Sequence, residues 1–503
     1  MTAASLLIRA DASVATGTGH VMRCLALAQA WQDAGGRALF ATVETTDALR
    51  ARLTAESCEV LSVSCVAGSA DDASQTIALA REQKTDWVVL DGYQFTADYQ
   101  RALKAAGFKL LVLDDHGHAQ HYSADLVLNQ NVCADESLYQ CRELTSRLLL
   151  GPRYCLLRRE FSPWQNWKRD VFPVCDRVLV TMGGSDPDNV TARVLEALDL
   201  AKLENVDATV VVGGSNPHFT RLQLASVQVG RKITVRRDVS NMPELMAEAD
   251  VAISAAGSTC WELCLLGLPS LLLDVAANQS ALSRELDRRG CAIRVGDQTV
   301  SPATIAMQLE HLLRSHELRQ TLSRNCRGLV DGQGAQRVVS ILRGVEEFRL
   351  RRSRAEDERL LWTWANDPEV RASSFSSETI GWETHVAWFA EKLVSGNSLM
   401  LIAEDDQGIP CGQIRFDIRE NREADLNISL AKEKRGRGLA VPMIQEGVRE
   451  LFASGDCECV HAFVKPENTP SLRAFEKAGF ARVGTAQVRG HAAVRFDMRR
   501  RLN

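Results

Sequence analysis

The first 345 residues alternate short apolar runs with stretches of helical spacing, and this alternation restricts the fold more than any other feature of the chain. Strands that alternate with helices form parallel sheets built from βαβ units. A strand covered on both faces reads as a continuous apolar run, as residues 87–90 do. The runs that we expect to form strands are residues 6–8, 38–42, 87–90, 110–113, 177–181, 209–212, 251–254 and 270–273.

Two interruptions divide the chain into three expected domains. Residues 152–173 include Pro163 and the aromatic residues Phe161, Trp164 and Trp167, and we expect them to cross between two α/β lobes. Residues 346–358 are dense in charge, which favours a solvated edge strand and helix start over a nucleic-acid patch. The predicted domains are residues 1–165, residues 166–345 and residues 346–503.

The net charge, the cysteines and the length of the apolar runs limit the classes of protein to which the chain can belong. The formal net charge is −5, so the chain has no global electrostatic footprint for nucleic acid, although backbone amides could still hold a phosphate. The 14 cysteines are scattered, and the nearest pairs, Cys457/Cys459 and Cys260/Cys264, do not build a four-ligand zinc site. No apolar run approaches the roughly 20 residues of a membrane span. We therefore expect a cytoplasmic enzyme with reduced thiols and no metal.

A strand, a glycine loop and an amphipathic helix follow one another at the start of the chain. Gly17 and Gly19 permit tight turns, and His20 then lies at a helix N-terminus, at the carboxyl end of the first strand. Open α/β sheets bind ligands at that edge, and a helix N-terminus disfavours a protonated imidazole. His20 is therefore a candidate general base, with a helix-capping role as the alternative.

Two glycine-bearing segments follow strands of the second lobe. Residues 183–185 and residues 257–259 can each present backbone amides to a diphosphate. Glu262 lies one turn into the helix that the later segment opens, where its carboxylate could accept hydrogen bonds from two ribose hydroxyls. The alternative is that the glycines only form turns and that Glu262 stabilises the helix start.

The run from Arg9 through Asp11 and His20 to Arg23 resembles the start of the PseG-type UDP-sugar hydrolases of pseudaminic acid biosynthesis, relatives of the MurG glycosyltransferases with a two-lobed GT-B fold. The likeness continues in order through about residue 345. It implies that His20, with Asp11 beside it, is catalytic. The residues predicted to bind substrate are Arg9, Gly19, Arg23, Tyr93, Gly183, Gly184, Ser185, Gly257, Ser258, Thr259, Glu262, Asn278 and Gln279.

The resemblance implies a reaction in which water attacks the anomeric carbon of a UDP-linked 2,4-diacetamido-2,4,6-trideoxy sugar and UDP leaves. His20 would deprotonate the water, and amides of the second lobe would stabilise the departing diphosphate, so no metal is expected. The acidic and imidazole cluster at residues 114–118 could suggest a metal site. A strand end and loop whose acidic groups face the cleft or solvent is the favoured interpretation.

Residues 435–440 follow an expected strand and match the (Q/R)-x-x-G-x-(G/A) loop of the GNAT acetyltransferases. Small residues there let consecutive amides point at the pyrophosphate of coenzyme A. Residues 464–480 resemble the segment that flanks the pantetheine arm, and the likeness covers about residues 348–503. The residues predicted to bind acetyl-CoA are Ile428, Leu430, Arg435, Gly436, Arg437, Gly438, Leu439, Ala440, Asn468, Ser471 and Phe475.

The C-terminal part departs from its family at one position. Many members carry a Tyr where this chain has Phe475, and that hydroxyl protonates the leaving thiolate. Here another group or water serves that step, or it is unaided. Residues 362–388 resemble the acceptor-side helices of PseH-like members, which acetylate the 4-amino group of the same UDP-sugar. His385 is the predicted base, with a hydrogen-bonded surface residue as the alternative, and Trp364 and Trp388 are expected to pack in the core.

The expected fold is α/β, with two Rossmann-like parallel-sheet lobes of GT-B type followed by a GNAT domain. The expected enzyme is bifunctional: it N-acetylates the 4-amino UDP-sugar with acetyl-CoA and hydrolyses UDP-2,4-diacetamido-2,4,6-trideoxy-beta-L-altrose to the free sugar and UDP, in a pathway linked to flagellin glycosylation. Its expected partners are the UDP-linked deoxyamino sugar and acetyl-CoA. The alternatives are a GT-B glycosyltransferase with an appended acyltransferase and a non-catalytic sensor of nucleotide sugar or acetyl-CoA.

Overall fold

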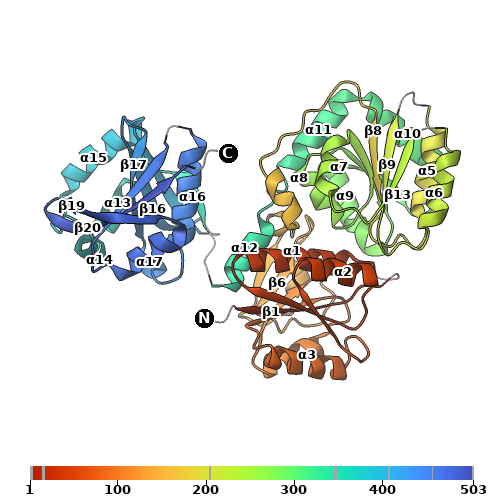
Figure 1. The fold of residues 1–503 in the computed structure, drawn as a ribbon, viewed down its shortest axis with the longest axis horizontal. Helices are drawn as coiled ribbons and strands as arrows, with labels where there is room; N and C mark the ends of the chain where they lie inside the picture. The colour runs from red at the N-terminus through yellow and green to blue at the C-terminus, as the bar shows by residue number, and fades with distance from the viewer. Residues whose placement is uncertain are drawn as a thin grey trace. The chain divides into compact units, whose positions relative to one another are not determined.

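The computed structural model of the protein describes residues 4–13, 17–202, 206–230, 232–344, 348–405, 408–455 and 457–500. The chain forms two compact units, Met1–Val339 and Ser340–Asn503 (Figure 1).

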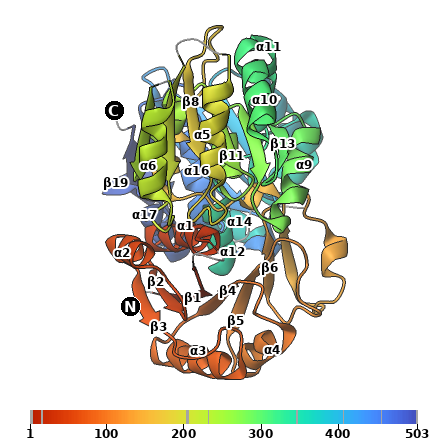
Figure 2. The ribbon, with the colours of Figure 1, turned by 90° about the vertical axis from the view of Figure 1, so that its right-hand side faces the viewer.

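The larger unit begins with a sheet of seven parallel strands in the order β3-β2-β1-β4-β5-β6-β7. The helices α1 and α2 cover one face and α3 and α4 cover the other (Figure 2). The order changes direction between β1 and β4, which are neighbours in the sheet. The elements are β1 (Ser5–Ala10), α1 (Gly19–Asp33), β2 (Arg37–Thr42), α2 (Asp47–Ala55), β3 (Glu59–Ser62), α3 (Ala70–Glu82), β4 (Trp87–Asp91), α4 (Ala97–Ala105), β5 (Lys109–Leu113), β6 (Leu126–Asn129), η1 (Glu136–Tyr139), β7 (Arg147–Leu150), η2 (Pro152–Tyr154) and η3 (Arg159–Trp164).

A second parallel sheet in the same unit has six strands in the order β10-β9-β8-β11-β12-β13. Its order also changes direction at its first strand, between β8 and β11. The elements are β8 (Arg177–Thr181), α5 (Val190–Leu200), β9 (Asp207–Val212), α6 (Phe219–Gln228), β10 (Ile233–Arg237), α7 (Met242–Glu248), β11 (Val251–Ala255), α8 (Thr259–Leu265), β12 (Ser270–Asp274), η4 (Ala277–Gln279), α9 (Ser280–Arg288), β13 (Ile293–Asp297), α10 (Pro302–Arg314), α11 (His316–Arg327) and α12 (Gly334–Leu342).

The segment between these two sheets is held by buried and half-buried arginines. Arg169 donates to the carbonyl oxygens of Met246, Ala249 and Leu266, at 2.6, 2.5 and 2.9 Å. These carbonyls lie at the C-terminal ends of α7 and α8, where helix dipoles favour a cation. The segment between the sheets is thereby fixed to the second sheet through helix ends.

The smaller unit contains a mixed sheet in the order β14-β15-β16-β17-β18-β20-β19. Only β17 and β18 are parallel, and their pairing stops after Asp425 and His461, although both strands continue. The elements are β14 (Arg349–Arg352), η5 (Ala355–Asp357), α13 (Glu358–Ala365), α14 (Pro368–Ser373), α15 (Trp382–Val394), β15 (Ser398–Glu404), β16 (Pro410–Ile418), β17 (Glu423–Leu430), η6 (Lys432–Lys434), α16 (Ala440–Ala453), β18 (Cys459–Val464), α17 (Thr469–Ala478), β19 (Ala481–Val488) and β20 (His491–Arg499).

The expected fold class is confirmed: two parallel-sheet lobes precede a domain with a mixed sheet. All eight apolar runs predicted as strands lie within strands, and the charged segment after residue 346 supplies an edge strand and a helix start. The first sheet ends at Leu150, the second begins at Arg177, and the division between the compact units follows Val339. The three domain ranges themselves stay a prediction.

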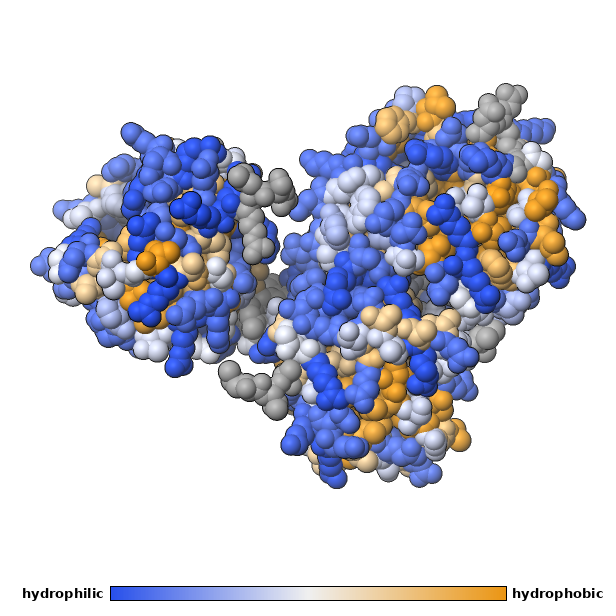
Figure 3. Space-filling model, in the orientation of Figure 1, coloured by the Kyte–Doolittle hydropathy of each residue, from blue (hydrophilic) through white to orange (hydrophobic). Residues whose placement is uncertain are grey.

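Large hydrophobic side chains are mostly inside the sheets and their covering helices. The face drawn in Figure 3 is largely hydrophilic, with hydrophobic residues gathered in smaller patches. Exposed examples such as Leu144, Val174 and Val227 are dispersed over different elements. No helix among the described residues has the length and apolar character needed to cross a bilayer.

Candidate functional sites

An imidazole–carboxylate pair lies where the first sheet changes direction. His20 is in the first turn of α1, after a loop in which Gly17 adopts a left-handed φ of +77°. Its Nδ1 lies 2.6 Å from Oδ1 of Asp91, the buried last residue of β4. β1 and β4 are neighbours, so their carboxyl ends bring the two side chains together at the edge where open α/β sheets bind ligands.

A chain of hydrogen bonds connects this pair to the second lobe. Arg23 donates to both oxygens of Asp91, at 2.6 and 2.7 Å, and to Oδ1 of Asp115, at 2.7 Å. The Tyr93 hydroxyl donates to Oδ2 of Asp115, at 2.9 Å. Asn278, in η4 of the second lobe, donates to the Tyr93 oxygen, at 3.0 Å. The predicted residues Tyr93 and Asn278 are thus in direct contact.

Electrostatics decides which nitrogen of His20 is free. Burial would raise the pKa of Asp91, but the charges of Arg23 and His20 hold it below its usual range. The same balance between burial and Arg23 lowers the pKa of Asp115. An ionised Asp91 accepts the proton of Nδ1, so Nε2 of His20 carries the lone pair. The His20 side chain is 18% exposed, which leaves it accessible to water.

The glycine loops of the two lobes face each other across this site. A Cβ on Gly184 would lie 2.0 Å from Oγ1 of Thr18, so the close approach requires glycine there. A Cβ added to Gly17 would lie 3.7 Å from Oγ of Ser185, and one added to Gly19 would lie 4.0 Å from Oγ of Ser258. The structure therefore brings the predicted loops at residues 17–19, 183–185 and 257–259 together.

Glu262 lies in the first turn of α8 beside Arg158, which was not predicted from the sequence as a site residue. Oε1 of Glu262 accepts a hydrogen bond from Arg158, at 2.7 Å, and burial raises the pKa of Glu262 against the opposing charge of Arg158. Gln279 uses its Oε1 to accept from the amide of Val275, at 3.0 Å, and so shapes the loop after β12. The other carboxylate oxygen of Glu262 accepts no hydrogen bond from the described residues.

Arg9 and Asp11 lie beneath the site rather than in it. The Arg9 side chain has no exposed surface and donates to both oxygens of Asp72, at 2.9 and 2.8 Å. Asp11 pairs with Arg9, at 2.8 Å, and accepts from the amide of Val43 and the side chain of Gln94, at 2.7 and 3.2 Å. These contacts give Arg9 a scaffolding position in place of the predicted substrate-binding one, because a fully paired buried guanidinium cannot reach a ligand, while the catalytic role of Asp11 stays a prediction.

The cluster at residues 114–118 forms the expected strand end and loop. Asp114 accepts the backbone N–H groups of residues 115–117 and a bond from the Tyr122 hydroxyl. Burial opposes these bonds, and contacts with His118 and Tyr122 still lower the pKa of Asp114 to about 2. Asp115 is the member of this cluster that faces the His20 site.

The loop predicted to bind acetyl-CoA has the required backbone shape. Gly436 and Gly438 have left-handed φ angles of +75° and +79°, and α16 starts directly after them. Arg435 pairs with Asp367 and Glu369 of the α14 segment, at 2.8 and 2.7 Å. Arg437 and Leu439 complete this loop. Ile428 and Leu430 lie on β17 beyond the point where β18 pairs with it.

The second element of that site is a capped helix. Asn468 accepts a hydrogen bond from the amide of Ser471, at 3.2 Å, and caps α17. Phe475 of the same helix is 4% exposed and packs against Phe480 and Phe496, with ring centroids 5.3 and 5.8 Å away. Phe475 therefore contributes to the hydrophobic core of the unit.

His385 is a core residue, which corrects both interpretations made from the sequence. It is 2% exposed, its Nε2 donates to the carbonyl oxygen of Glu358 at 2.9 Å, and its ring stacks on Phe389. Burial lowers its pKa. An imidazole enclosed in this way cannot reach an acceptor amine. Trp364 and Trp388 pack against the same small cluster, as expected.

Three residues of the first site were missed as site residues by sequence reasoning. Asp91 is the last residue of β4, Asp115 lies two residues after the end of β5, and Arg158 lies in the segment between the sheets. A polar residue at the carboxyl end of a strand beside β1 is the signal that could have identified Asp91, since such ends converge on one edge of a sheet.

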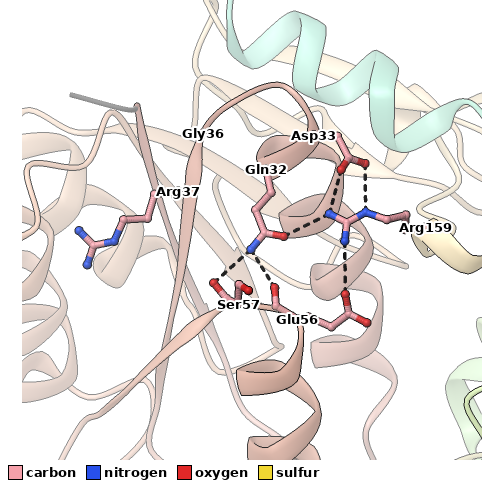
Figure 4. Close-up of a pocket in the computed structure, with 7 residues that line it drawn as sticks. All are labelled: Gln32, Asp33, Gly36, Arg37, Glu56, Ser57 and Arg159. Carbon is pink, nitrogen blue, oxygen red and sulfur yellow. Dashed lines mark hydrogen bonds and ion pairs between the residues drawn. The ribbon is translucent and has the colours of Figure 1, made fainter. Parts of the chain in front are cut away.

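A surface hollow at the opposite end of α1 has different chemistry (Figure 4). Arg159 points toward Gln32, Asp33 and Glu56 and pairs with Asp33 at 2.9 Å. Arg37 extends away from this group, toward Glu59. The polar groups of the hollow bind one another, so they fasten η3 to the first lobe.

Two protein-family models match the chain. The glycosyltransferase family 28 C-terminal domain matches residues 177–337, and the acetyltransferase (GNAT) domain matches residues 347–481.

Curated relatives cover either the larger unit or nearly the whole chain. The UDP-2,4-diacetamido-2,4,6-trideoxy-beta-L-altropyranose hydrolase of Campylobacter jejuni is 26% identical over 57% of this chain and 97% of its own length. The spore coat polysaccharide biosynthesis protein SpsG of Bacillus subtilis is 27% identical over 68% and 98%. An uncharacterized protein of Methanocaldococcus jannaschii is 22% identical over 94% and 96%.

Solved structures resemble each unit in turn. MurG of Acinetobacter baumannii is 18% identical and covers 68% of this chain and 99% of its own, with a TM-score of 0.48. Spermidine N-acetyltransferase of Vibrio cholerae, solved with CoA and spermine, is 19% identical and covers 30% and 95%, with a TM-score of 0.28.

The strand orders and the matched ranges agree on how the chain is organised into domains. Residues 177–337 lie within the larger unit, and residues 347–481 lie within the smaller one. The chain therefore joins a larger unit, which contains a region matching the glycosyltransferase family 28 C-terminal domain and is similar in sequence to a UDP-sugar hydrolase, to a C-terminal region matching the GNAT acetyltransferase domain.

Proposed function

We propose that the chain carries two consecutive steps of amino-sugar biosynthesis: N-acetylation of a UDP-linked 4-amino deoxysugar by the smaller unit, then release of UDP from the diacetamido product by the larger one. The observation that carries the hydrolytic step is the His20–Asp91 pair, at 2.6 Å, at the edge where the first sheet changes direction. The Campylobacter hydrolase, named for this diacetamido UDP-sugar, supports the choice of substrate.

The hydrolytic step starts at Nε2 of His20. That nitrogen takes a proton from water while the water oxygen forms a bond to the anomeric carbon. The bond between that carbon and the phosphate oxygen breaks, and UDP leaves with the electron pair. Asp91 is a positioning residue here, because it holds Nδ1–H and stabilises the imidazolium that forms.

The second lobe supplies the groups for the leaving UDP. The loops at residues 183–185 and residues 257–259 lie beside the His20 loop, and their backbone amides are the proposed donors to the diphosphate. Glu262 is the proposed acceptor for the ribose hydroxyls, with Arg158 fixing its carboxylate. Hydrogen-bond donors of this kind provide leaving-group stabilisation with no metal in the step.

The acetyl transfer uses backbone groups of the smaller unit. The loop at residues 435–440 binds the pyrophosphate of acetyl-CoA, and the diverging ends of β17 and β18 leave backbone donors and acceptors for the pantetheine arm. The acceptor amine attacks the thioester carbon, the carbon–sulfur bond breaks, CoA leaves as the thiolate, and the nitrogen releases its extra proton to water. Phe475 cannot protonate the departing thiolate. A thiolate is still a tolerable leaving group, because the pKa of its thiol is about 8.5.

The test is an assay with purified full-length protein and the 4-amino UDP-sugar, followed by NMR of the products. With acetyl-CoA we expect the acetylated sugar, free of UDP, and without acetyl-CoA little UDP release. UDP formed from the diacetamido UDP-sugar with no added acceptor supports hydrolysis. UDP release that requires an acceptor sugar or lipid would instead support the glycosyltransferase alternative, and no turnover of either substrate would contradict the proposal.

A further inference from the structure

The polar face of the smaller unit's sheet contains a cluster of side chains that neither proposed reaction uses. Cys459 and His461 are alternate residues of β18, so they point to one face, and Asp497 lies opposite His461 on β20. The sulfur, one imidazole nitrogen and one carboxylate oxygen all lie within 4.8 Å of one another. The alternate residues Val460, Ala462 and Val464 of β18 point to the other face, into the hydrophobic core with α16 and α17.

The cluster is buried and its donor atoms converge. Cys459 is 6% and His461 2% exposed. Nδ1 of His461 lies 2.8 Å from Oδ1 of Asp497 and 4.0 Å from Sγ of Cys459. Ligands around one tetrahedral zinc ion lie roughly 3–4 Å apart, given bond lengths of about 2.0–2.3 Å. The three atoms therefore need only small shifts to share an ion.

A second carboxylate faces the other nitrogen of the same ring. Oε2 of Glu423 lies 3.1 Å from Nε2 of His461, and Nε2 is buried with no other partner among the described residues. A neutral imidazole carries one N–H and one lone pair. If Nε2–H points to Glu423, the lone pair of Nδ1 faces an oxygen lone pair of Asp497 at 2.8 Å. A carboxylate that orients a histidine in this way is the usual outer neighbour of a metal-bound imidazole.

The guanidinium of Arg495 lies beside the converging atoms of His461 and Asp497. Nη2 of Arg495 is 3.2 Å from Nδ1 of His461 and 2.9 Å from Oδ2 of Asp497. Its side chain is 40% exposed, so it can turn into solvent. The guanidinium occupies the position that a smaller, more highly charged cation would take between the same acceptors.

We propose that Cys459, His461 and Asp497 form a binding site for a divalent transition-metal ion such as Zn²⁺, with Glu423 as the orienting carboxylate. Thiolate, imidazole and carboxylate together favour this class of ion over Mg²⁺ or Ca²⁺. On binding, the Cys459 thiol releases its proton to solvent, Arg495 moves out, and water completes the coordination. Sequence spacing hides this site, because Asp497 is 36 positions from His461 and only the β18–β20 register joins them.

The test uses full-length protein and Co²⁺, whose bond to a thiolate absorbs in the near ultraviolet. We expect one equivalent of Co²⁺ to give that band and Zn²⁺ to remove it. Cys459→Ser should abolish the band. Cys411→Ser is the matched control, since Cys411 is also buried in the smaller unit but outside the cluster, and it should retain the band.

Two further variants separate a metal site from a plain ionic cluster. Glu423→Gln should weaken Zn²⁺ binding by roughly tenfold or more, the usual cost of losing an orienting neighbour. Arg495→Ala should strengthen it, because it removes the competing guanidinium. Folding is checked by acetyl-CoA binding. A wild-type protein and an Arg495→Ala variant that both fold and give no thiolate band would overturn the proposal and assign a doubly protonated imidazolium between the two carboxylates. Neither outcome depends on the proposed sugar chemistry, since the assay contains no sugar.

Discussion

His20 and His385 were predicted to do the same chemical work, and the structure gives them opposite surroundings. His20 lies at the carboxyl edge of a parallel sheet, keeps 18% of its side chain exposed and faces the ionised carboxylate of Asp91. His385 lies within α15, is 2% exposed and faces a neutral backbone carbonyl.

The difference shows what makes a histidine useful as a base. A carboxylate partner fixes the tautomer and stabilises the charge that proton transfer creates. A carbonyl partner in an apolar enclosure fixes the tautomer but offers no compensation for that charge. Under the proposed function, the larger unit therefore uses His20 as a base, whereas the smaller unit relies on backbone groups to bind and orient acetyl-CoA. The predictions below test this contrast.

The largest effect should follow from His20→Ala. Loss of the base should lower UDP release from the diacetamido UDP-sugar by roughly 10²–10⁴-fold. Acetyl transfer should be unchanged, since that unit folds around its own core. Both rates can be measured on one preparation by following UDP and CoA. Near-normal UDP release would remove His20 from the mechanism.

A smaller loss is expected for Asp91→Asn. The amide can still accept from Nδ1, but it supplies no charge for the imidazolium, and it can instead select the other tautomer. We expect UDP release to fall by about 10–10³-fold, with UDP affinity kept within a few-fold. The pH–rate profile should also shift, because the carboxylate that stabilised the charged ring is gone. An unchanged profile would mean that Asp91 only fills space.

In the smaller unit, substitutions that strain the backbone should lower acetyl-CoA affinity, whereas in the larger unit the loss of one side chain should lower UDP release. Gly436→Val with Gly438→Val places Cβ branches at φ angles of +75° and +79°, which L-residues rarely adopt. Acetyl-CoA affinity, measured by calorimetry, should fall by roughly 30-fold or more, in line with about 1–3 kcal/mol of strain at each of the two positions.

Gly396→Val is a matched control for these substitutions. It lies in the same unit, has no left-handed φ and would place a Cβ in open space. Acetyl-CoA affinity equal to wild type in the double variant would show that residues 435–440 are not the pyrophosphate site.

The sequence predicted central strands better than edge strands, for a physical reason. β1, β4, β8, β11 and β12 are covered on both faces and read as continuous apolar runs. β3, β10 and β13 lie at or near sheet edges, are partly exposed and carry mixed residues, so no run identified them. Burial on both faces is what makes a strand visible in a sequence.

The prediction of site residues was limited in a similar way, because it depended on features that are local in the sequence. The glycine loop and its helix identified His20, because neighbours in the chain set that geometry. The partners Asp91, Asp115 and Arg158 come from distant segments and become partners only through strand order and packing. His385 shows the reverse error: its helix was recognised, but its burial and its hydrogen bond to the carbonyl oxygen of Glu358 on α13 depend on tertiary packing.

The smallest effect should come from His385→Phe, and it should appear in stability rather than in rate. Burial lowers the pKa of His385 in the folded unit, while the unfolded chain keeps a value near about 6.5. Below that pH the unfolded chain binds a proton that the native unit does not, so native stability falls as pH drops from about 6.5 toward the lowered pKa. Above pH 6.5, His385 contributes no pH dependence to the stability.

Calorimetry of the smaller unit's unfolding transition at pH 7.5 and 5.5 checks this. The stability lost between these two pH values should be smaller in His385→Phe than in wild type, on top of a pH-independent loss of about 1 kcal/mol for the missing hydrogen bond. His491→Gln, at an exposed position of β20, should keep the wild-type difference. If His385→Phe folds normally but acetyl transfer collapses, the residue is catalytic and the contrast with His20 fails.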